Sequence, residues 1–480
     1  MTRRHSVLFA FFVFPGLALC VTALSAQERT VTGGPPPGVR AVLDAFVKAV
    51  NSGSVEQFQA MARTHFAPAL LVRQTDQQRA TGFKEMTAEF GTIAIESVRR
   101  RGPSAPLNLA VKGSTGVTGV ITLELEDSAP FRITSLGVDV GGGGGPDQPG
   151  VPPPPISRTM SKEDLSKALD AYLSAFAADG RLSGVVLVAK DGKALFEKAY
   201  GLADRSNSVP NTMATRFSLG SINKSFTQTA IAQLVAAGKL SYTDTLGALI
   251  PDYPQEQTRT ATIEQLLRHT AGIPDFFGEE FARAPKDRFR SNADYYRFVS
   301  SKPPLCAPGT RNQYCNGCYI TLGAIIERVS GMPYERYIGE HVFKPAGMSA
   351  AFPQADAIEP NIAQGYTRRG VDGQVRSSIF MRGAAGSAAG SAYATAGDLI
   401  AFDNALRERR LLDEKGLARI FSSASGNTGR VMGDFGIAGG APGTNAVLES
   451  DGVWAVVVLT NFDPPTGESL GLAIQKALAR

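Results

Sequence analysis

Residues 141–157 limit the possible folds of this chain more than any other feature, because their composition marks a boundary between two domains. The stretch begins with five consecutive glycines and also contains four consecutive prolines, Pro152 to Pro155. Glycine-rich sequence is flexible and proline-rich sequence is stiff and extended, so this composition is typical of a linker. The whole chain has 480 residues, enough for more than one domain. We therefore predict two separately folded units, residues 39–140 and residues 158–480.

Residues 1–26 have the organisation of a secretory signal peptide. Two arginines near the start precede an apolar run over residues 7–24, and small residues suit cleavage after Ala26. A retained membrane anchor is the alternative, but Pro15 and Gly16 interrupt the apolar run. No other apolar run in the sequence has the length of a membrane span. We expect an exported protein, periplasmic or secreted, that does not span the membrane after cleavage.

The composition is that of a globular protein without a concentrated charge. Hydrophobic residues make up 43% and charged residues 19% of the chain, and the formal net charge is +5. The basic residues are dispersed, apart from the run Arg99, Arg100 and Arg101. Nucleic-acid-binding domains usually carry a basic patch or stripe, so no nucleic-acid partner is expected.

The first unit, residues 39–140, shows helical patterns followed by strand patterns. Apolar periodicity predicts two helices, and alternation of apolar and polar residues predicts three strands. The helices are expected at residues 39–50 and 54–63, and the strands at residues 107–111, 118–126 and 131–140. This order resembles the cone-like α+β fold of nuclear-transport-factor-2-like domains. The resemblance implies a pocket or a homodimer face, and a stabilising appendage without a ligand is the alternative.

Ser221 and Lys224 stand three residues apart at the expected start of a helix in the second unit. Their side chains therefore project from the same face of the first helical turn. A serine hydroxyl is a poor nucleophile until a neighbouring base takes its proton, and a lysine amine can be that base. The spacing S-x-x-K is typical of serine acyl-enzymes. It also occurs by chance, in which case the lysine is a solvated helix residue.

Further stretches in the same order resemble the class C β-lactamase-like serine hydrolases. That family includes β-lactamases, D-alanyl-D-alanine carboxypeptidases, D-aminopeptidases and esterases. The matching stretches are Tyr314-Cys315-Asn316, residues 266–274 with the sequence LLRHTAGIP, residues 394–399, and the glycine-rich residues 436–443. The resemblance runs from about Leu165 to the C-terminus. It implies an α+β, β-lactamase/transpeptidase-like fold, in which helices flank an antiparallel sheet and form a helical subdomain.

The resemblance also implies roles for the site residues. Ser221 would be the nucleophile and Lys224 its base, while Tyr314 would move the proton between serine, leaving group and water. Asn316 would hold the lysine and the amide side of the substrate. The backbone N–H groups of Ser221 and Gly440 would form the oxyanion hole, where a glycine lets the substrate approach closely. The resemblance implies an acyl substrate, small or peptide-like, and no metal or cofactor.

Residues 437–439 depart from the family pattern. The family has Lys-Thr-Gly or His-x-Gly at this place, whereas the chain has Ile437, Ala438 and Gly439. The missing cation and hydroxyl bind the substrate carboxylate in the family, and Ile437 better suits an uncharged acyl or ester group. We therefore predict an esterase-like hydrolase with Ile437, Gly439 and Gly440 beside the substrate.

Two alternatives to the esterase prediction stay open. One is β-lactamase, carboxypeptidase or D-aminopeptidase activity, which would require a substitute cation. The candidates for that cation are Arg368, Arg369, Arg382 and Arg430. The other alternative is a catalytically silent ligand-binding or sensor protein.

His269 and three cysteines complete the candidate residues. His269 lies in the stretch RHTAG, which we interpret as a structural landmark of the family rather than as a catalytic residue. Cys306, Cys315 and Cys318 remain after signal cleavage, and in an oxidising compartment two of three usually pair. We expect a bridge from Cys306 to Cys315 or Cys318 that clamps the Tyr314 loop. A zinc site at the C-x-x-C spacing is the alternative, which the lack of a second cysteine pair disfavours.

Overall fold

The computed structural model describes residues 36–99, 107–140, 151–355, 359–367, 374–424 and 435–479. The predicted signal peptide, residues 141–150 of the predicted linker, Arg100 and Arg101 lie outside these residues. The last part of the predicted linker is described, and Ile156 is buried in a core of the second unit, so that unit begins before the predicted residue 158. Within the described ranges, no helix is both long enough and apolar enough to cross a membrane.

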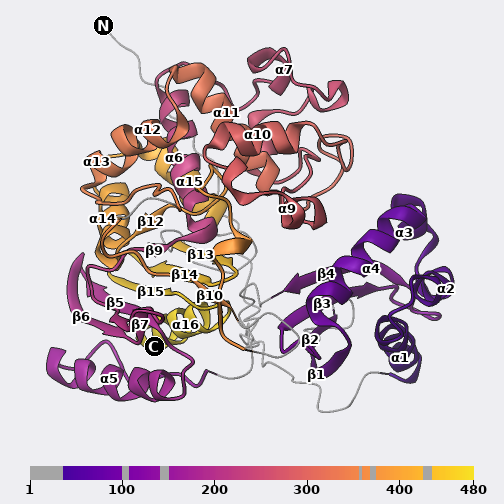
Figure 1. Ribbon diagram of the computed structural model, residues 1–480, viewed down its shortest axis with the longest axis horizontal. Coiled ribbons are helices and arrows are strands. Elements are labelled where there is room, and N and C mark those ends of the chain that lie inside the picture. The colour runs from indigo at the N-terminus through magenta and orange to yellow at the C-terminus, as the bar shows by residue number, and fades with distance from the viewer. Residues whose placement is uncertain are drawn as a thin grey trace, which may run out of the picture.

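The first unit packs four helices against a four-stranded antiparallel sheet whose strands are neighbours in chain order (Figure 1). Its core is organised around Phe58, whose ring contacts the rings of Phe46, Phe66 and Phe83. The elements are α1 (Pro37–Asn51), α2 (Val55–His65), α3 (Pro68–Arg73), α4 (Asp76–Phe90), β1 (Ile93–Arg99), β2 (Leu107–Gly113), β3 (Thr118–Leu125) and β4 (Ile133–Val140). The resemblance of this unit to a nuclear-transport-factor-2-like cone stays a prediction.

The second unit is built on a five-stranded antiparallel sheet in the order β13-β14-β15-β5-β6. These strands are β5 (Gly184–Lys190), β6 (Lys193–Tyr200), β13 (Phe435–Ala441), β14 (Thr444–Ser450) and β15 (Trp454–Thr460). Asp191 and Gly192 join β5 to β6 with φ angles of 50° and 72°, as a tight hairpin turn requires. The pairing of β5 with β15 brings the beginning and the end of the unit together.

Helices cover both faces of this sheet, because its side chains alternate between two cores. Val186 and Val188 share a core with α5 (Lys162–Ala178) and α16 (Thr466–Leu478). Val185 and Leu187 face the larger core. Three of its helices are α6 (Asn223–Ala236), α11 (Asn316–Ser330) and α14 (Ala396–Arg407). This arrangement confirms the predicted α+β class, with helices flanking an antiparallel sheet.

A helical region and several short strands occupy the middle of the chain (Figure 1). Helix α11 is buried from Asn316 to Ile326, as expected for a helix that is apolar on nearly all sides. The remaining elements are β7 (Leu202–Asp204), β8 (Val209–Pro210), β9 (Phe217–Ser218), η1 (Gly220–Ile222), α7 (Leu246–Leu249), η2 (Glu256–Thr258), α8 (Ile263–Leu267), α9 (Glu279–Arg283), η3 (Lys286–Arg288), α10 (Asn292–Ser300), α12 (Tyr334–Ile338), η4 (Gly339–Phe343), α13 (Lys344–Ala346), β10 (Tyr366–Thr367), β11 (Arg376–Ser377), η5 (Ile379–Met381), β12 (Tyr393–Ala394) and α15 (Glu414–Ala424).

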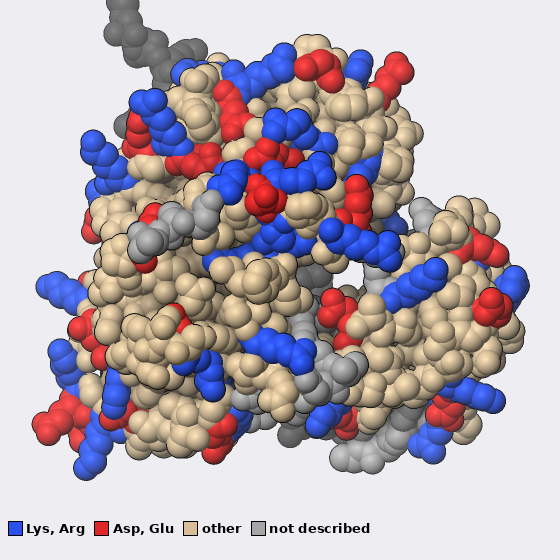
Figure 2. Space-filling model, in the orientation of Figure 1, with Lys and Arg blue, Asp and Glu red and all other residues tan. Residues whose placement is uncertain are grey.

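The surface charge is mixed. On the face that Figure 2 shows, Lys and Arg side chains are interspersed with Asp and Glu side chains over the second unit. The part of the second unit that this view shows therefore does not favour one sign of ligand.

Candidate active site

Ser221 lies in the short turn η1, between strand β9 and helix α6. The preceding residue, Gly220, has φ +49°, a left-handed conformation that glycine adopts without steric cost. A Cβ atom on Gly220 would lie 3.0 Å from the backbone nitrogen of Gly440. The serine turn and the edge strand β13 are therefore in close contact, and Ser221 is held between them at the start of α6.

Lys224 is 7% exposed, and its ammonium nitrogen meets three oxygen atoms. Lys224 Nζ is 3.2 Å from Ser221 Oγ, 2.7 Å from Asn316 Oδ1 and 2.7 Å from the backbone oxygen of Ala389. A charged lysine donates to all three. A neutral amine has two N–H groups for Asn316 and Ala389, and its lone pair then points to the serine hydroxyl. The same arrangement therefore suits the amine before and after it accepts a proton.

Tyr314 also contacts Ser221. Its hydroxyl oxygen is 2.6 Å from Ser221 Oγ, and Lys224 Nζ lies 4.8 Å from the centroid of its ring. The structure thus brings the three predicted catalytic side chains together, with the serine oxygen in contact with both others. The side chain of Tyr314 remains 54% exposed, so an incoming substrate can reach its hydroxyl.

Asn316 is the first residue of α11 and is held at both ends of its amide. Its Oδ1 accepts from Lys224, and its Nδ2 donates to Asp275 Oδ2 at 2.8 Å. Asp275, which was not among the predicted site residues, therefore orients the asparagine that contacts the lysine. The carboxylate lies just after the HTAG stretch, so this neighbourhood was the only sequence signal for it.

His269 also belongs to the site. Its ring stacks on Tyr314 with 4.8 Å between centroids and 27° between planes. Its Nδ1 accepts a hydrogen bond from the backbone N–H of Cys315 at 3.1 Å. Burial, and to a smaller extent the charge of Lys224, lower the pKa of His269 to about 4. The imidazole is therefore neutral at physiological pH. Its ring contacts that of Tyr314 and lies close enough to Lys224 for the lysine charge to affect its pKa.

Gly439 and Gly440 lie on the edge strand β13, directly against the serine turn. A Cβ on Gly439 would lie 2.0 Å from the carbonyl oxygen of Leu219 and 2.8 Å from the backbone nitrogen of Ser221. No side chain fits at Gly439, because the obstructing atoms belong to the backbone. Ile437 is half-buried and packs against the larger core. The strand therefore presents backbone to Ser221 and offers no cation at residues 437–439.

The β-lactamase family model, described as Beta-lactamase, matches residues 169–480, which is more than half of the chain. The chain belongs to this family. It is a serine hydrolase of the β-lactamase and penicillin-binding-protein type, as the resemblance implied. The match begins within α5 and contains every site residue discussed above.

Individual relatives of the chain are also named as penicillin-binding proteins. PbpX of Bacillus subtilis is 33% identical over 250 residues, which are 51% of this chain and 60% of PbpX. Penicillin-binding protein 4* of Bacillus subtilis is 26% identical over 312 residues, covering 61% of this chain and 68% of that protein. The structure of a penicillin-binding protein from Bacillus halodurans is similar with a TM-score of 0.58 and 29% identity, covering 64% of this chain and 99% of the other.

A D-amino acid amidase from Ochrobactrum anthropi SV3 has the same fold. Its TM-score is 0.55 at 23% identity, and the similarity covers 65% of this chain and 98% of the amidase. At this identity the comparison establishes the fold of the β-lactamase-family unit and not its substrate.

The disulfide differs from the prediction. Cys315 is bonded to Cys318, and Cys306 is the free cysteine among the described residues. The expected bridge from Cys306 was wrong. Cys315 is the N-cap of α11 and Cys318 lies in its first turn, so their Cα atoms are only 5.3 Å apart. This distance suits a disulfide without any movement of the chain. The bridge encloses Asn316, so the bond still restrains the catalytic loop. The two cysteines that the zinc alternative needed as ligands are bonded to each other.

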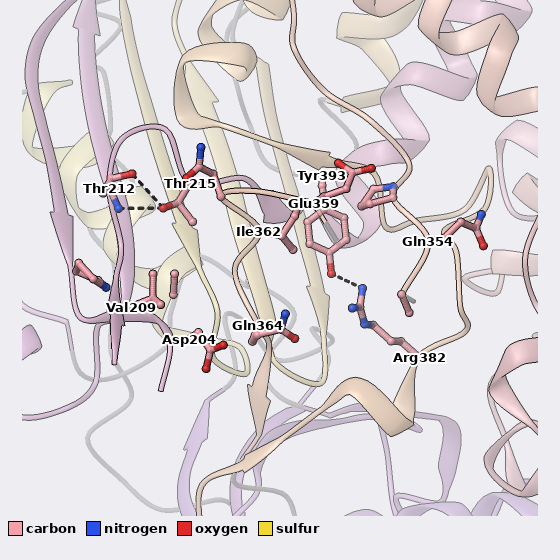
Figure 3. Close-up of a pocket in the computed structure, with 15 residues that line it drawn as sticks. Asp204, Val209, Thr212, Thr215, Gln354, Glu359, Ile362, Gln364, Arg382 and Tyr393 are labelled. Atoms are coloured by element: carbon pink, nitrogen blue, oxygen red, sulfur yellow. Dashed lines mark hydrogen bonds between the residues drawn. The ribbon is translucent and has the colours of Figure 1, made fainter. Parts of the chain in front are cut away.

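A separate cavity of about 420 Å³ lies beside strands β7, β8 and β12 (Figure 3). Arg382 points to Tyr393 across this cavity and donates a hydrogen bond to its hydroxyl. None of Ser221, Lys224, Tyr314 and Asn316 lines it. Arg382 is therefore engaged away from the serine, and the other three candidates for a substitute cation, Arg368, Arg369 and Arg430, lie outside the described residues.

Proposed function

We propose that this protein is an exported esterase that cleaves neutral ester substrates through an acyl-serine intermediate. The observation that carries the proposal is the position of Ser221 Oγ, within hydrogen-bonding distance of both Lys224 Nζ and Tyr314 Oη. A nucleophile in contact with two proton-transfer groups can form and break an acyl bond without a metal ion.

In the proposed acylation, Ser221 Oγ attacks the ester carbonyl while its proton passes to the neutral amine of Lys224. The negative charge that develops on the carbonyl oxygen is stabilised by the backbone N–H groups of Ser221 and Gly440. Tyr314 then delivers a proton to the leaving alkoxide, so that an alcohol departs and the acyl-serine remains. General acid–base transfers of this kind accelerate a reaction by roughly 10²- to 10⁴-fold.

In deacylation, a water molecule attacks the acyl-serine and gives its proton to the Tyr314 phenolate, while the protonated Lys224 holds the proton that Ser221 gave up. The same backbone N–H groups stabilise the second tetrahedral intermediate, and its collapse returns the proton to Ser221 Oγ. The products are a carboxylic acid and a free enzyme. Asn316 and Asp275 keep Lys224 in place during both steps.

The absence of a cation at residues 437–439 and the apolar character of the surroundings support an uncharged substrate. Ile437 replaces the cationic residue of the family, and Ala438 beside it is also apolar. An unpaired carboxylate beside these side chains would lose its hydration without gaining a partner. A neutral acyl group gains roughly 25 cal/mol for each Å² of apolar surface that it buries there.

Export is supported by two independent observations. The first 26 residues have the pattern of a signal peptide, and Cys315 and Cys318 form a disulfide. Structural disulfides persist in oxidising compartments such as the periplasm or the extracellular space.

The test is a substrate panel with the purified full chain and its Ser221→Ala variant as control. The panel contains p-nitrophenyl acetate and butyrate, a chromogenic cephalosporin and D-amino-acid amides. We expect the highest kcat/KM for an ester and no turnover above background with the alanine variant. Faster hydrolysis of the cephalosporin or of a D-amino-acid amide would overturn the esterase assignment in favour of the corresponding alternative. Failure of a fluorophosphonate or a penicillin to label Ser221 would indicate the silent binding protein.

A further inference from the structure

His269 holds the chain on both sides of Tyr314. Its backbone oxygen accepts from the N–H of Gln313 at 3.1 Å, and its Nδ1 accepts from the N–H of Cys315 at 3.1 Å. Between these two hydrogen bonds, the imidazole ring lies against the ring of Tyr314 with an interplanar angle of 27°. His269 thus contacts the ring of Tyr314 and the backbone of the residues immediately before and after it, Gln313 and Cys315.

The backbone of His269 is adapted to this task. Its φ is +60°, in the left-handed region that is uncommon for residues other than glycine and that Asn, Asp and His enter more readily than most. Residues held in this region cost free energy and persist where the surrounding structure requires them. Here the conformation directs both the carbonyl group and the side chain of His269 toward residues 313–315.

The charge state of His269 is compatible with this contact. An Nδ1 that accepts a hydrogen bond carries no proton, so the neutral imidazole has its proton on Nε2. The groups that face it are Lys224 from α6, the ring of Tyr314, and the ring of Tyr319 from α11 at 5.2 Å. Burial and the Lys224 charge lower the pKa of His269, and a neutral ring adds no second positive charge beside Lys224.

Tyr314 needs such a support. It precedes α11 and is 54% exposed, so few packed side chains restrict its motion. Its hydroxyl nevertheless has to stay 2.6 Å from Ser221 Oγ for a proton to pass. A misplacement of about 1 Å in a catalytic group can cost on the order of 100-fold in rate.

We propose that His269 is a positioning residue that holds Tyr314 in reach of Ser221, through its hydrogen bond to Cys315 N–H and its ring stacking. The proposal rests on the role of Tyr314 in proton transfer under the proposed function. It assigns a role in the reaction to a residue whose sequence context indicated only a structural landmark.

The test compares two substitutions that both tolerate a positive φ. His269→Asn keeps an acceptor, Oδ1, at the place of Nδ1, whereas His269→Gly removes the acceptor and the ring. For hydrolysis of p-nitrophenyl acetate, we expect the asparagine variant to stay within about tenfold of the wild-type kcat and the glycine variant to lose about 100-fold, with KM changed less than about threefold. Equal kcat values for the two variants would overturn the proposal.

A double variant separates positioning from a general loss of structure. If His269 acts through Tyr314, His269→Gly should lower kcat by less than about threefold in a Tyr314→Phe background, because the group it positions is already lost. A full additional loss in that background would overturn the proposal. If His269→Gly folds poorly, the asparagine variant is compared in the two backgrounds instead: the loss of kcat that it shows with Tyr314 present should be absent with Tyr314→Phe, and an equal loss in both backgrounds would overturn the proposal. A wild type without ester turnover would instead contradict the proposed function, so the two failures are distinguishable.

Discussion

At the scale of single residues, the site depends on the hydrogen-bond partners of Lys224, which are complete. Lys224 Nζ has one oxygen neighbour for each proton of a charged ammonium group. Removal of Asn316 or of the lysine itself would leave a buried polar group without its partner, which costs about 1–3 kcal/mol or more when the group is charged. The site is therefore a unit whose members act together.

The first prediction follows from this unit. Lys224→Ala and Tyr314→Phe should each lower kcat by about 100-fold or more, since each removes a proton-transfer group. The double variant should lose little more than the worse single variant, because residues that share one proton path are not additive. Steady-state kinetics with p-nitrophenyl acetate measures this. Losses that multiply in the double variant would show that Lys224 and Tyr314 do not share a path.

The second prediction concerns Ile437. Ile437→His, or Ile437→Lys together with Ala438→Thr, should raise the ratio of kcat/KM for a carboxylate-bearing substrate to that for a neutral ester. A tenfold change in this ratio requires about 1.4 kcal/mol, which one charge-assisted hydrogen bond can supply. Ile437→Leu is the matched control and should leave the ratio unchanged. An unchanged ratio in both cationic variants would mean that residue 437 does not face the substrate.

At the scale of elements, the sequence predicted those parts of the site that follow local patterns. The S-x-x-K spacing placed Ser221 and Lys224 on one turn at the start of a helix, where the structure has η1 and α6. Strand β13 was missed because Gly436, Gly439 and Gly440 carry no side chains that could show an alternating pattern. Asp275 and the contacts of His269 were missed because they depend on how separate loops meet, which periodicity does not describe.

The third prediction concerns the cysteines at the start of α11. Alkylation of the exported, denatured protein without reduction should modify Cys306 alone and leave Cys315 and Cys318 in one linked peptide. Peptide mapping by mass spectrometry is needed, because intact mass would show one modified cysteine for any single bridge. A modified Cys315 or Cys318 would contradict the observed pairing. After reduction, all three should react.

The fourth prediction concerns Glu327 of the same helix. Burial raises its pKa to about 7, although its carboxylate accepts from the N–H of Tyr334 at 3.1 Å. A raised pKa in the folded state means that the folded protein binds a proton that the unfolded chain releases from about pH 4.5 upward. The stability that protonated Glu327 provides is therefore lost as the pH rises through about 7.

Glu327→Gln should accordingly stabilise the protein at high pH only. Glutamine keeps an acceptor for Tyr334 and carries no charge. We expect a gain of about 1–3 kcal/mol in the free energy of unfolding at pH 8.5 and little change at pH 5, measured by urea denaturation. Glu340→Gln is the control, because Glu340 is paired with Arg336 at the surface and its pKa is lowered. A pH-independent effect of Glu327→Gln would contradict the assignment.

At the scale of the whole molecule, the chain has separate hydrophobic cores before and after residues 141–150. Among the described residues, the core of the first unit extends from Val39 to Ile133, and the two cores of the second unit begin at Ile156 and at Val185. A unit with its own core can fold alone. Every site residue that the structure brings together belongs to the second unit, so the chemistry does not require contacts from the first.

The last prediction follows from this separation. The variant is a chain that starts at Val151 and is exported, so that Cys315 and Cys318 can pair. Its kcat/KM for an ester should stay within about threefold of that of the full chain, a difference of less than about 1 kcal/mol in activation free energy. If the first unit provides a homodimer face, light scattering should show a dimer for the full chain and a monomer for the shortened one. Two monomers would instead favour a stabilising appendage. A folded but inactive shortened chain would show that the first unit contributes to the active site after all.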